Sequence, residues 1–183
     1  MKNSPITLVE PCVEMLDGYA AALRRGWSPN TMRDVSADEL EAVEVDPVAF
    51  LADLTNQDGT VLMGDGSEKP RLPFRIYWIS DGDFCGAIGL RFARGTEALP
   101  SYVPGHIGYA IVPWKQRRGY ATQALRLLLP VAWAEGLTGV AISCDADNEG
   151  SKKVILANGG VLVGEVPNDP ETGKSKLNFR IAR

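Results

Sequence analysis

The stretch GYAIVPWKQRRGYATQALRLLL, residues 108–129, contains the pattern on which the fold prediction depends. An apolar run ends at Pro113, a basic turn with a glycine follows, and a helical pattern then begins. We therefore expect a strand, a short turn and a helix over residues 118–135. The apolar face of this amphipathic helix would carry Ala121, Leu125, Leu128 and Ala132.

The turn between this strand and this helix has the chemistry of an anion site. The first N–H groups of a helix lack partners within the helix and carry a partial positive charge from the helix dipole. Arg117 and Arg118 stand beside them, and Gly119 lets the backbone approach an oxygen without a Cβ in the way. A solvated surface turn is the alternative interpretation. The pattern favours a pyrophosphate cradle at residues 117–122, called the cradle below.

Composition limits the classes of protein to which the chain can belong. It has 183 residues, of which 45% are hydrophobic and 23% charged, as expected for one globular domain over residues 1–183. No run approaches the roughly 20 apolar residues that span a membrane, and the first residues do not resemble a signal peptide. Three cysteines without CxxC spacing favour a cytoplasmic location, and a net charge of −4 argues against nucleic-acid binding. A single histidine argues against a metal site.

The N-terminal part reads as a strand and helices, followed by a loop. A capping-box pattern, S-x-x-E, starts a helix at Ser36, and the Asp46-Pro47 pair interrupts it. The composition of residues 57–73 is typical of a loop. Before Ser36 we expect a strand at residues 6–11 and a helix at 12–25.

The rest of the chain alternates like a sheet with interspersed helices. An Asp-Gly pair predicts a hairpin between the first two strands, and the glycines of the second strand indicate a bulge or close backbone approach. A helix from about Asn148 would end at the asparagine and glycines of residues 158–160. The whole predicts an α/β fold with a mixed sheet. We expect strands at residues 74–80, 84–93, 106–112, 139–145, 161–166 and 176–182.

The cradle sequence resembles a known signature. No Walker A or GxGxxG motif is present, but QRRGYA (116–121) is similar to the Q/R-x-x-G-x-G/A signature of the GNAT N-acetyltransferase superfamily. The order of strands and helices over residues 74–183 resembles that family as well. The resemblance implies a central, mostly antiparallel sheet of six to seven strands flanked by helices. Residues 1–73 match only in layout and would frame the acceptor site.

The resemblance also implies a set of cofactor contacts. Backbone groups of Ile111 and Val112 would pair with the pantetheine arm of acetyl-CoA, and Asn148 and Ser151 would lie near that arm or the thiol. For Asn148 and Ser151, plain helix capping is the alternative. The pyrophosphate would be held by the amides of Arg117, Arg118, Gly119, Tyr120, Ala121 and Thr122.

The acid and the base of the reaction are less clear. Many family members carry a tyrosine where this chain has Ile155, which cannot donate a proton. His106, the only histidine, is the candidate catalytic base, and a structural strand-end histidine is the alternative. Cys144 reads as a core residue rather than a nucleophile. Other acidic candidates are Glu44, Glu97, Asp145 and Asp147.

The implied function is that of an acyl-CoA-dependent N-acetyltransferase, with acetyl-CoA as cosubstrate and no metal. The acceptor would be an amine-bearing small molecule or a protein or peptide, with no nucleic acid and no membrane as partner. Trp27 would wall the acceptor pocket or cover the core. A homodimer is the assembly considered. The alternatives are a non-catalytic acyl-CoA-binding or sensing module, and a transferase that uses a longer acyl-CoA.

Overall fold

The computed structural model describes residues 5–31, 33–62, 66–167 and 173–183. The chain divides into two compact units, and each is described by itself. The first unit comprises residues 1–55, 75–89 and 109–128, and the second comprises residues 56–74, 90–108 and 129–183.

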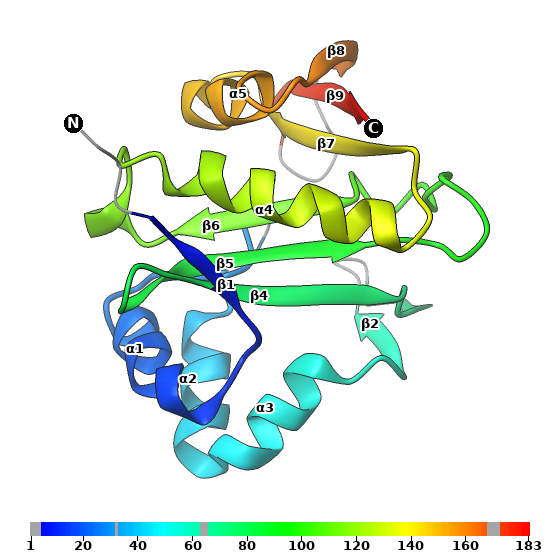
Figure 1. Cartoon of the computed structure of the whole chain (residues 1–183). Helices are drawn as coiled ribbons and strands as arrows, with labels where there is room; N and C mark the ends of the chain where they lie inside the picture. The colour runs from blue at the N-terminus through cyan, green and yellow to red at the C-terminus, as the bar shows by residue number, and fades with distance from the viewer. Residues whose placement is uncertain (1–4, 32, 63–65, 168–172) are drawn as a thin grey trace. The chain divides into compact units, whose positions relative to one another are not determined.

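Helices and strands follow the predicted order closely (Figure 1). The helices are α1 (Val13–Arg24), α2 (Ser36–Val45), α3 (Pro47–Thr55), the 3₁₀ helix η1 (Pro113–Lys115), α4 (Tyr120–Ala134) and α5 (Glu149–Leu156). The strands are β1 (Thr7–Val9), β2 (Thr60–Leu62), β3 (Glu68–Pro70), β4 (Phe74–Ser80), β5 (Phe84–Arg91), β6 (Ile107–Ile111), β7 (Gly139–Asp145), β8 (Val161–Val166) and β9 (Lys176–Ala182).

The strands pair in sheets that confirm the predicted α/β class. The order is β1-β4-β5-β6 in a four-stranded sheet and β7-β9-β8 in a three-stranded sheet, and β2 pairs with β3. The pairs β1/β4, β2/β3, β7/β9 and β8/β9 are all antiparallel. Six to seven strands were expected in one central sheet, and they are paired here as a sheet of four and a sheet of three.

The core of the first unit is aromatic. The ring of Tyr19 in α1 stacks on Trp78 in β4, with ring centroids 4.8 Å apart, and meets Trp27 and Phe84 edge to face. Burying such large rings stabilises the packing of α1 against the sheet by the apolar area that each removes from water. Trp27 is buried in this cluster, so its indole covers the core.

Two local predictions are wrong. The predicted capping box at Ser36 does not form, because Asp34 Oδ1 accepts from the Ser36 amide while the Glu39 carboxylate accepts from the Tyr19 hydroxyl. A partner on another helix has displaced the local hydrogen bond. The predicted loop at residues 57–73 contains the short strands β2 and β3, which are too brief to show an alternating pattern.

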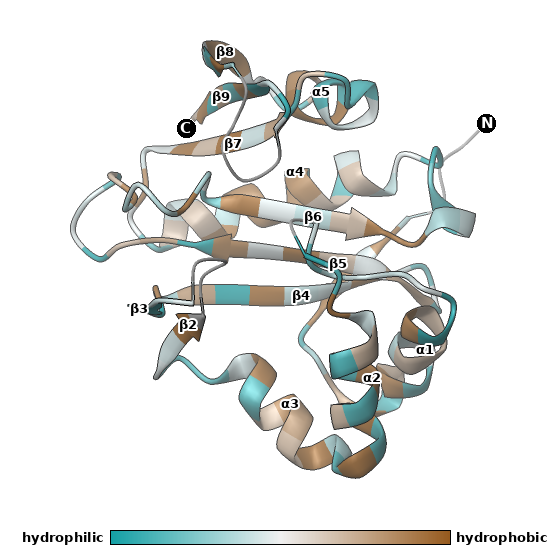
Figure 2. Ribbon diagram, turned by 180° about the vertical axis from the view of Figure 1, so that it is seen from behind, coloured by the Kyte–Doolittle hydropathy of each residue, from teal (hydrophilic) through white to brown (hydrophobic). Residues whose placement is uncertain are grey.

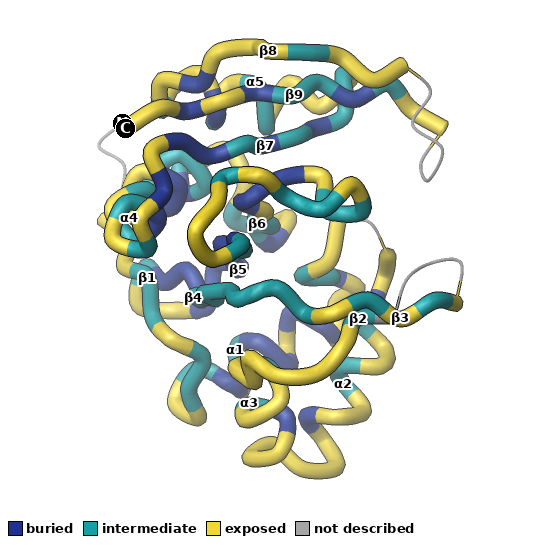
Figure 3. The backbone as a smooth tube through the Cα atoms, turned by 90° about the vertical axis from the view of Figure 1, so that its right-hand side faces the viewer, coloured by how far each residue is buried: buried dark blue, intermediate teal, exposed yellow. Residues whose placement is uncertain are grey.

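In the second unit, β8 is an edge strand with exposed apolar side chains. It is largely hydrophobic in Figure 2 and largely exposed in Figure 3. The strand pairs with β9 along one side only in the β7-β9-β8 sheet. Its exposed residues include Val161, Leu162, Val163 and Val166.

Candidate functional site

The cradle begins where β6 gives way to η1. The amide of Lys115 donates to the carbonyl of Val112 at 2.9 Å, which closes the 3₁₀ turn. Arg117 and Gly119 then adopt left-handed backbone conformations, with φ of 60° and 75°. A left-handed arginine is uncommon, so Arg117 has a strained conformation. Its presence indicates that the local backbone path is imposed by surrounding contacts.

The cradle ends in the first turn of α4. The amide of Gln123 donates to the carbonyl of Gly119 at 3.1 Å, which is the first hydrogen bond of the helical pattern. The amides of Gly119, Tyr120 and Ala121 precede it and therefore have no acceptor four residues back. They point out of the helix N-terminus, where an anion is favoured.

The edge of β6 distinguishes the two predicted pantetheine contacts. The Val112 amide donates to Cys85 in β5 at 3.0 Å, and the Val112 carbonyl accepts from Lys115, so both groups are engaged within the chain. Because backbone groups alternate along a strand, those of Ile111 face away from β5. The Ile111 carbonyl accepts from Gln116 Nε2 at 3.1 Å. The predicted pairing with pantetheine therefore stays a prediction for the Ile111 amide.

Two arginines contact Trp114 in η1, one at its ring and one at its carbonyl. The Arg25 guanidinium lies 3.3 Å from the centroid of that ring, and the Arg118 guanidinium donates to the Trp114 carbonyl at 3.3 Å. Arg117 and Arg118 are exposed. The cradle thus lies in a locally positive environment, although the whole chain carries a net charge of −4.

The side chains that hold the two ends of the cradle turn were not predicted from the sequence. Asp81, between β4 and β5, accepts hydrogen bonds from Lys115 and from the Tyr120 hydroxyl. Burial tends to raise the pKa of Asp81, but these donors outweigh it and hold the pKa well below its usual value. The Asp-Gly pair marked this segment only as a turn, and no sequence signal indicated the longer-range contacts.

Asn148 and Ser151 lie at the start of α5 in the second unit. Asn148 Oδ1 accepts from the Ser151 amide at 2.9 Å, so the capping interpretation is confirmed for Asn148. Burial raises the pKa of the nearby Cys144 thiol, which disfavours a nucleophilic thiolate. Ile155 is fully buried one helical turn further along.

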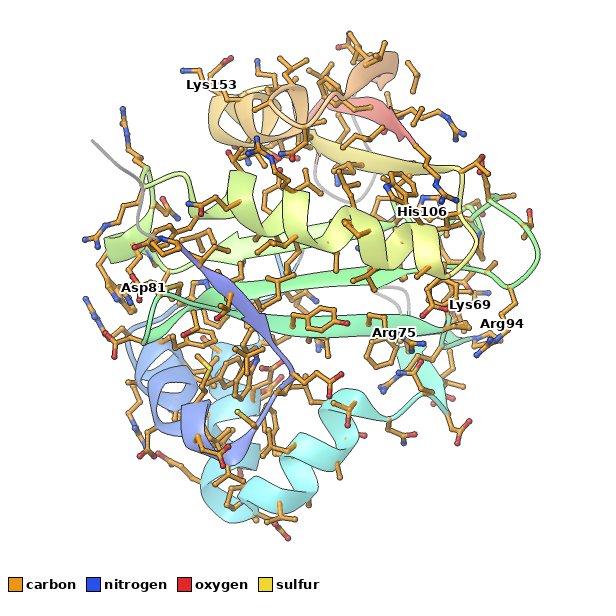
Figure 4. All side chains as sticks on the ribbon, viewed as in Figure 1. Lys69, Arg75, Asp81, Arg94, His106 and Lys153 are labelled. Atoms are coloured by element: carbon orange, nitrogen blue, oxygen red, sulfur yellow. The ribbon has the colours of Figure 1, made fainter. Side chains whose placement is uncertain are left out.

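His106 makes two hydrogen bonds to one residue of β7. Its amide donates to the Ala141 carbonyl at 2.7 Å, and its Nδ1 accepts from the Ala141 amide at 2.9 Å (His106 is labelled in Figure 4). Because Nδ1 accepts, the neutral imidazole carries its proton on Nε2. Nε2 is buried and has no hydrogen-bond partner among the described residues. Burial lowers the pKa of His106, which favours this neutral form.

The four acidic candidates all have basic partners. Glu97 binds Arg180 at 2.8 Å and Glu44 binds Arg24 at 2.8 Å. Asp145 and Asp147 lie 3.5 and 3.3 Å from the ammonium of Lys174. Across the described ranges, no group of histidine, cysteine or acidic side chains could hold a metal ion. Nor is any helix in those ranges long and apolar enough to cross a membrane.

The predicted site residues fall into two sets. The cradle, together with Ile111 and Val112, lies in the first unit, where the chain brings these residues together around the start of α4. His106, Asn148 and Ser151 lie in the second unit, where Asn148 and Ser151 share one helix end. Each set is described within its own unit.

Comparisons with known proteins show which family and which solved structures the chain resembles. A family model described as an acetyltransferase (GNAT) domain matches residues 31–161. The comparison with curated protein sequences finds no significant match. Among solved structures, the chain is similar to the Microcin C7 self immunity acetyltransferase MccE in complex with acetyl-CoA and AMP, with 14% identity and a TM-score of 0.65. The alignment covers 99% of this chain and 94% of that one.

Two further structures have a similar fold. One is the acetyltransferase of Salmonella typhimurium that modifies the N-terminal serine of ribosomal protein L7/L12, with 15% identity and a TM-score of 0.64, covering 97% of this chain and 95% of that one. The other is RimJ of Mycobacterium smegmatis in complex with CoA-disulfide, with 14% identity and a TM-score of 0.61, covering 97% and 81%. At these identities the likeness concerns the fold.

Proposed function

The chain belongs to the GNAT acetyltransferase family, and on this premise we propose that it transfers an acetyl group from acetyl-CoA to a primary amine. The observation that carries the proposal is the cradle. Two left-handed residues, Arg117 and Gly119, place the backbone beside the first amides of α4, in positive surroundings. This combination suits a pyrophosphate.

The residues present fit the cofactor. The amides of residues 117–122 would hold the pyrophosphate, and the guanidinium groups of Arg117 and Arg118 would balance its charge. The amide of Ile111 would pair with the pantetheine arm as an added strand does. Asn148 and Ser151 would lie along that arm, with Asn148 also fixing the start of α5. Bound acetyl-CoA supplies the activated acetyl group as a thioester.

Transfer requires a neutral amine. Its lone pair attacks the thioester carbonyl carbon, a C–N bond forms, the C–S bond breaks, and the thiolate takes up a proton while the amine loses one. A backbone N–H of β6 would stabilise the developing oxyanion. Neutralising a lysine of pKa ~10.4 at pH 7 costs roughly 4.6 kcal/mol, whereas an α-amine of pKa ~8 costs about 1 kcal/mol.

These costs favour an α-amine as acceptor. The acidic candidates are engaged in ion pairs, and His106 gives its Nδ1 lone pair to the Ala141 amide. An α-amine needs little help from a base, so water could accept its proton. One similar structure is a ribosomal L7/L12 alpha-N-protein acetyltransferase in complex with CoA, which supports this choice. The second candidate for the proton acceptor is His106 as general base.

A second candidate function is acyl-CoA binding without transfer. Ile155 occupies the place where many family members have a tyrosine that protonates the departing thiolate, and it is fully buried. A binding or sensing module needs the cradle but no such proton donor. A transferase that uses a longer acyl-CoA would need the same cradle and would catalyse the same type of acyl transfer to an amine.

A panel of matched peptides tests the proposal. One peptide offers a free α-amine and no lysine, and its partner has a blocked N-terminus and one lysine. Each peptide is incubated with the protein and acetyl-CoA, and the released CoA thiol and the mass of the peptide are measured. We expect the first peptide to be acetylated. If the protein binds CoA but releases no thiol with either peptide or with any small amine, the result would support a binding or sensing module. Thiol release only with a longer acyl-CoA would support a transferase that uses a longer acyl-CoA. Absence of CoA binding would overturn the proposal.

A further inference from the structure

A single carboxylate, that of Asp81, bonds to both flanks of the cradle turn. Asp81 lies between β4 and β5 (labelled in Figure 4). Lys115 Nζ lies 2.7 Å from its Oδ1, and the Tyr120 hydroxyl donates to its Oδ2 at 2.6 Å. Lys115 ends η1 and Tyr120 begins α4. One side chain therefore connects the segment before Arg117–Gly119 with the segment after it.

We propose that Asp81 is a positioning residue for pyrophosphate binding, because it fixes both flanks of the cradle and so sets the direction of the cradle amides. The inference rests on the proposed function, since it assigns a role within the same site. Asp81 itself need not touch the cofactor.

The two contacts are shielded from water. The side chains of Asp81 and Lys115 are 13% and 12% exposed, and Tyr120 is buried. Hydrogen bonds to a charged group in such surroundings are shorter and stronger than those between neutral groups. Removing the charge at Asp81 would leave the Lys115 ammonium largely buried without its nearest counterion, so Lys115 would move.

The cradle backbone needs support from outside. Arg117 and Gly119 have left-handed backbone conformations. This conformation is unfavourable for an arginine, so contacts with neighbouring residues must stabilise it. Amide directions follow directly from these dihedral angles. A cradle whose ends are fixed presents its amides without the ordering cost that a mobile loop would bear on binding.

The ion pair between Asp81 and Lys115 also indicates which cationic side chains are left to bind the pyrophosphate. The Lys115 ammonium lies between Asp81 and the sulfur of Cys85, 3.5 Å away. It is committed to the protein interior, which leaves the exposed guanidinium groups of Arg117 and Arg118 for the anion.

Asp83 offers a matched control in the same turn. Its carboxylate lies 3.8 Å from the Lys115 ammonium and its side chain is 89% exposed. Asp83 therefore carries the same charged group as Asp81 but interacts only weakly with Lys115. If Asp81 merely stabilised the hairpin, substitution of either aspartate would act on stability alone. If Asp81 positions the cradle, only its substitution changes cofactor affinity.

Calorimetric titration with CoA tests the proposal in the full chain. Asp81→Asn keeps a residue that favours the turn but removes the charge, and it should weaken CoA binding by about tenfold. Asp83→Asn should stay within about twofold of the unsubstituted protein. Equal affinities for Asp81→Asn and the unsubstituted protein would overturn the inference. Failure of the unsubstituted protein to bind CoA would instead overturn the proposed function.

Hydrogen exchange distinguishes a local change at the cradle from a loss of overall stability. In the protein without CoA, the amides of Lys115 and Gln123, which donate to the Val112 and Gly119 carbonyls on the two sides of the cradle turn, should exchange at least about threefold faster in Asp81→Asn, while those of α1 keep their rates. Uniformly faster exchange would indicate global destabilisation and count against positioning. Should Asp81→Asn not fold, Tyr120→Phe removes only the hydroxyl. It should weaken CoA binding by about threefold, and unchanged affinity there would overturn the inference.

Discussion

Gly86 in β5 lies directly against the backbone of Ala110 in β6. A Cβ placed on Gly86 would be 2.1 Å from the Ala110 carbonyl oxygen, and the glycine has a φ of +145°. Side chains rarely adopt that backbone conformation, and no side chain tolerates that contact. The close approach predicted from the glycines of this segment is thereby confirmed. It holds β5 against the strand that leads into the cradle.

Gly86→Ala should therefore destabilise the protein strongly. We expect a loss of about 2–4 kcal/mol in the free energy of unfolding, because the methyl group must push apart two paired strands as well as strain the backbone. Gly82→Ala is the control, since Gly82 has a φ of +110° but no neighbour within 4 Å of the position that a methyl group would take. It should cost about 1–2 kcal/mol from backbone strain alone. Urea unfolding measures both, and equal losses would contradict the contact with Ala110.

Gly119→Val should weaken CoA binding. A β-branched side chain disfavours the φ of 75° and would stand beside the amides that we propose bind the pyrophosphate, so we expect at least a tenfold loss of affinity, or about 1.4 kcal/mol. Gly95→Val is the control, with a φ of 76° and no neighbour within 4 Å. Titration of both variants with CoA separates backbone strain from a blocked site. Loss of affinity in both, or in neither, would contradict the role of Gly119.

Sequence patterns predicted most of the elements because those patterns are local. The strands at residues 139–145, 161–166 and 176–182 match the structure, since each is an apolar or alternating segment bounded by turn residues. The interruption at Asp46 is also confirmed, and the aspartate caps α3 by accepting from the amides of Val48 and Ala49. Such signals lie within a few residues of the element they define.

What the sequence could not reveal depends on contacts between distant residues. Asp81 meets partners 34 and 39 positions away, and nothing in a turn pattern identifies them. The sequence predicted a capping box with Glu39, but in the structure the Glu39 carboxylate accepts a hydrogen bond from the Tyr19 hydroxyl, 20 positions earlier.

Substitution of His106 separates its two candidate roles. The Oδ1 of an asparagine can take the place of Nδ1 as acceptor for the Ala141 amide, but it cannot act as a base at neutral pH. His106→Asn should retain nearly full stability, whereas His106→Ala leaves a buried amide unpaired and should cost about 1–3 kcal/mol. If the imidazole is the general base, both variants lose acetyl transfer with unchanged CoA affinity. Equal stabilities of the two variants would contradict the hydrogen bond to Ala141.

Glu97 should make stability depend on pH in the acidic range. Hydrogen bonds from the Thr138 hydroxyl and from Arg180, together with one from the Thr138 amide, lower its pKa from 4.5 to about 2. Between these values the unfolded chain binds a proton that the folded chain excludes, so stability falls as pH falls. The contribution is fully present above pH 4.5 and is lost on approach to pH 2.

The matched variant for that measurement is Glu97→Gln, which keeps an oxygen for Thr138 but cannot ionise. Urea midpoints of both proteins, measured from pH 7 down to pH 2, should differ most above pH 4.5 and converge as the glutamate takes up its proton. The two proteins should converge because a protonated Glu97 and a glutamine are both uncharged partners of Arg180. A difference that stays constant across this range would mean that the carboxylate is not held ionised by Thr138 and Arg180.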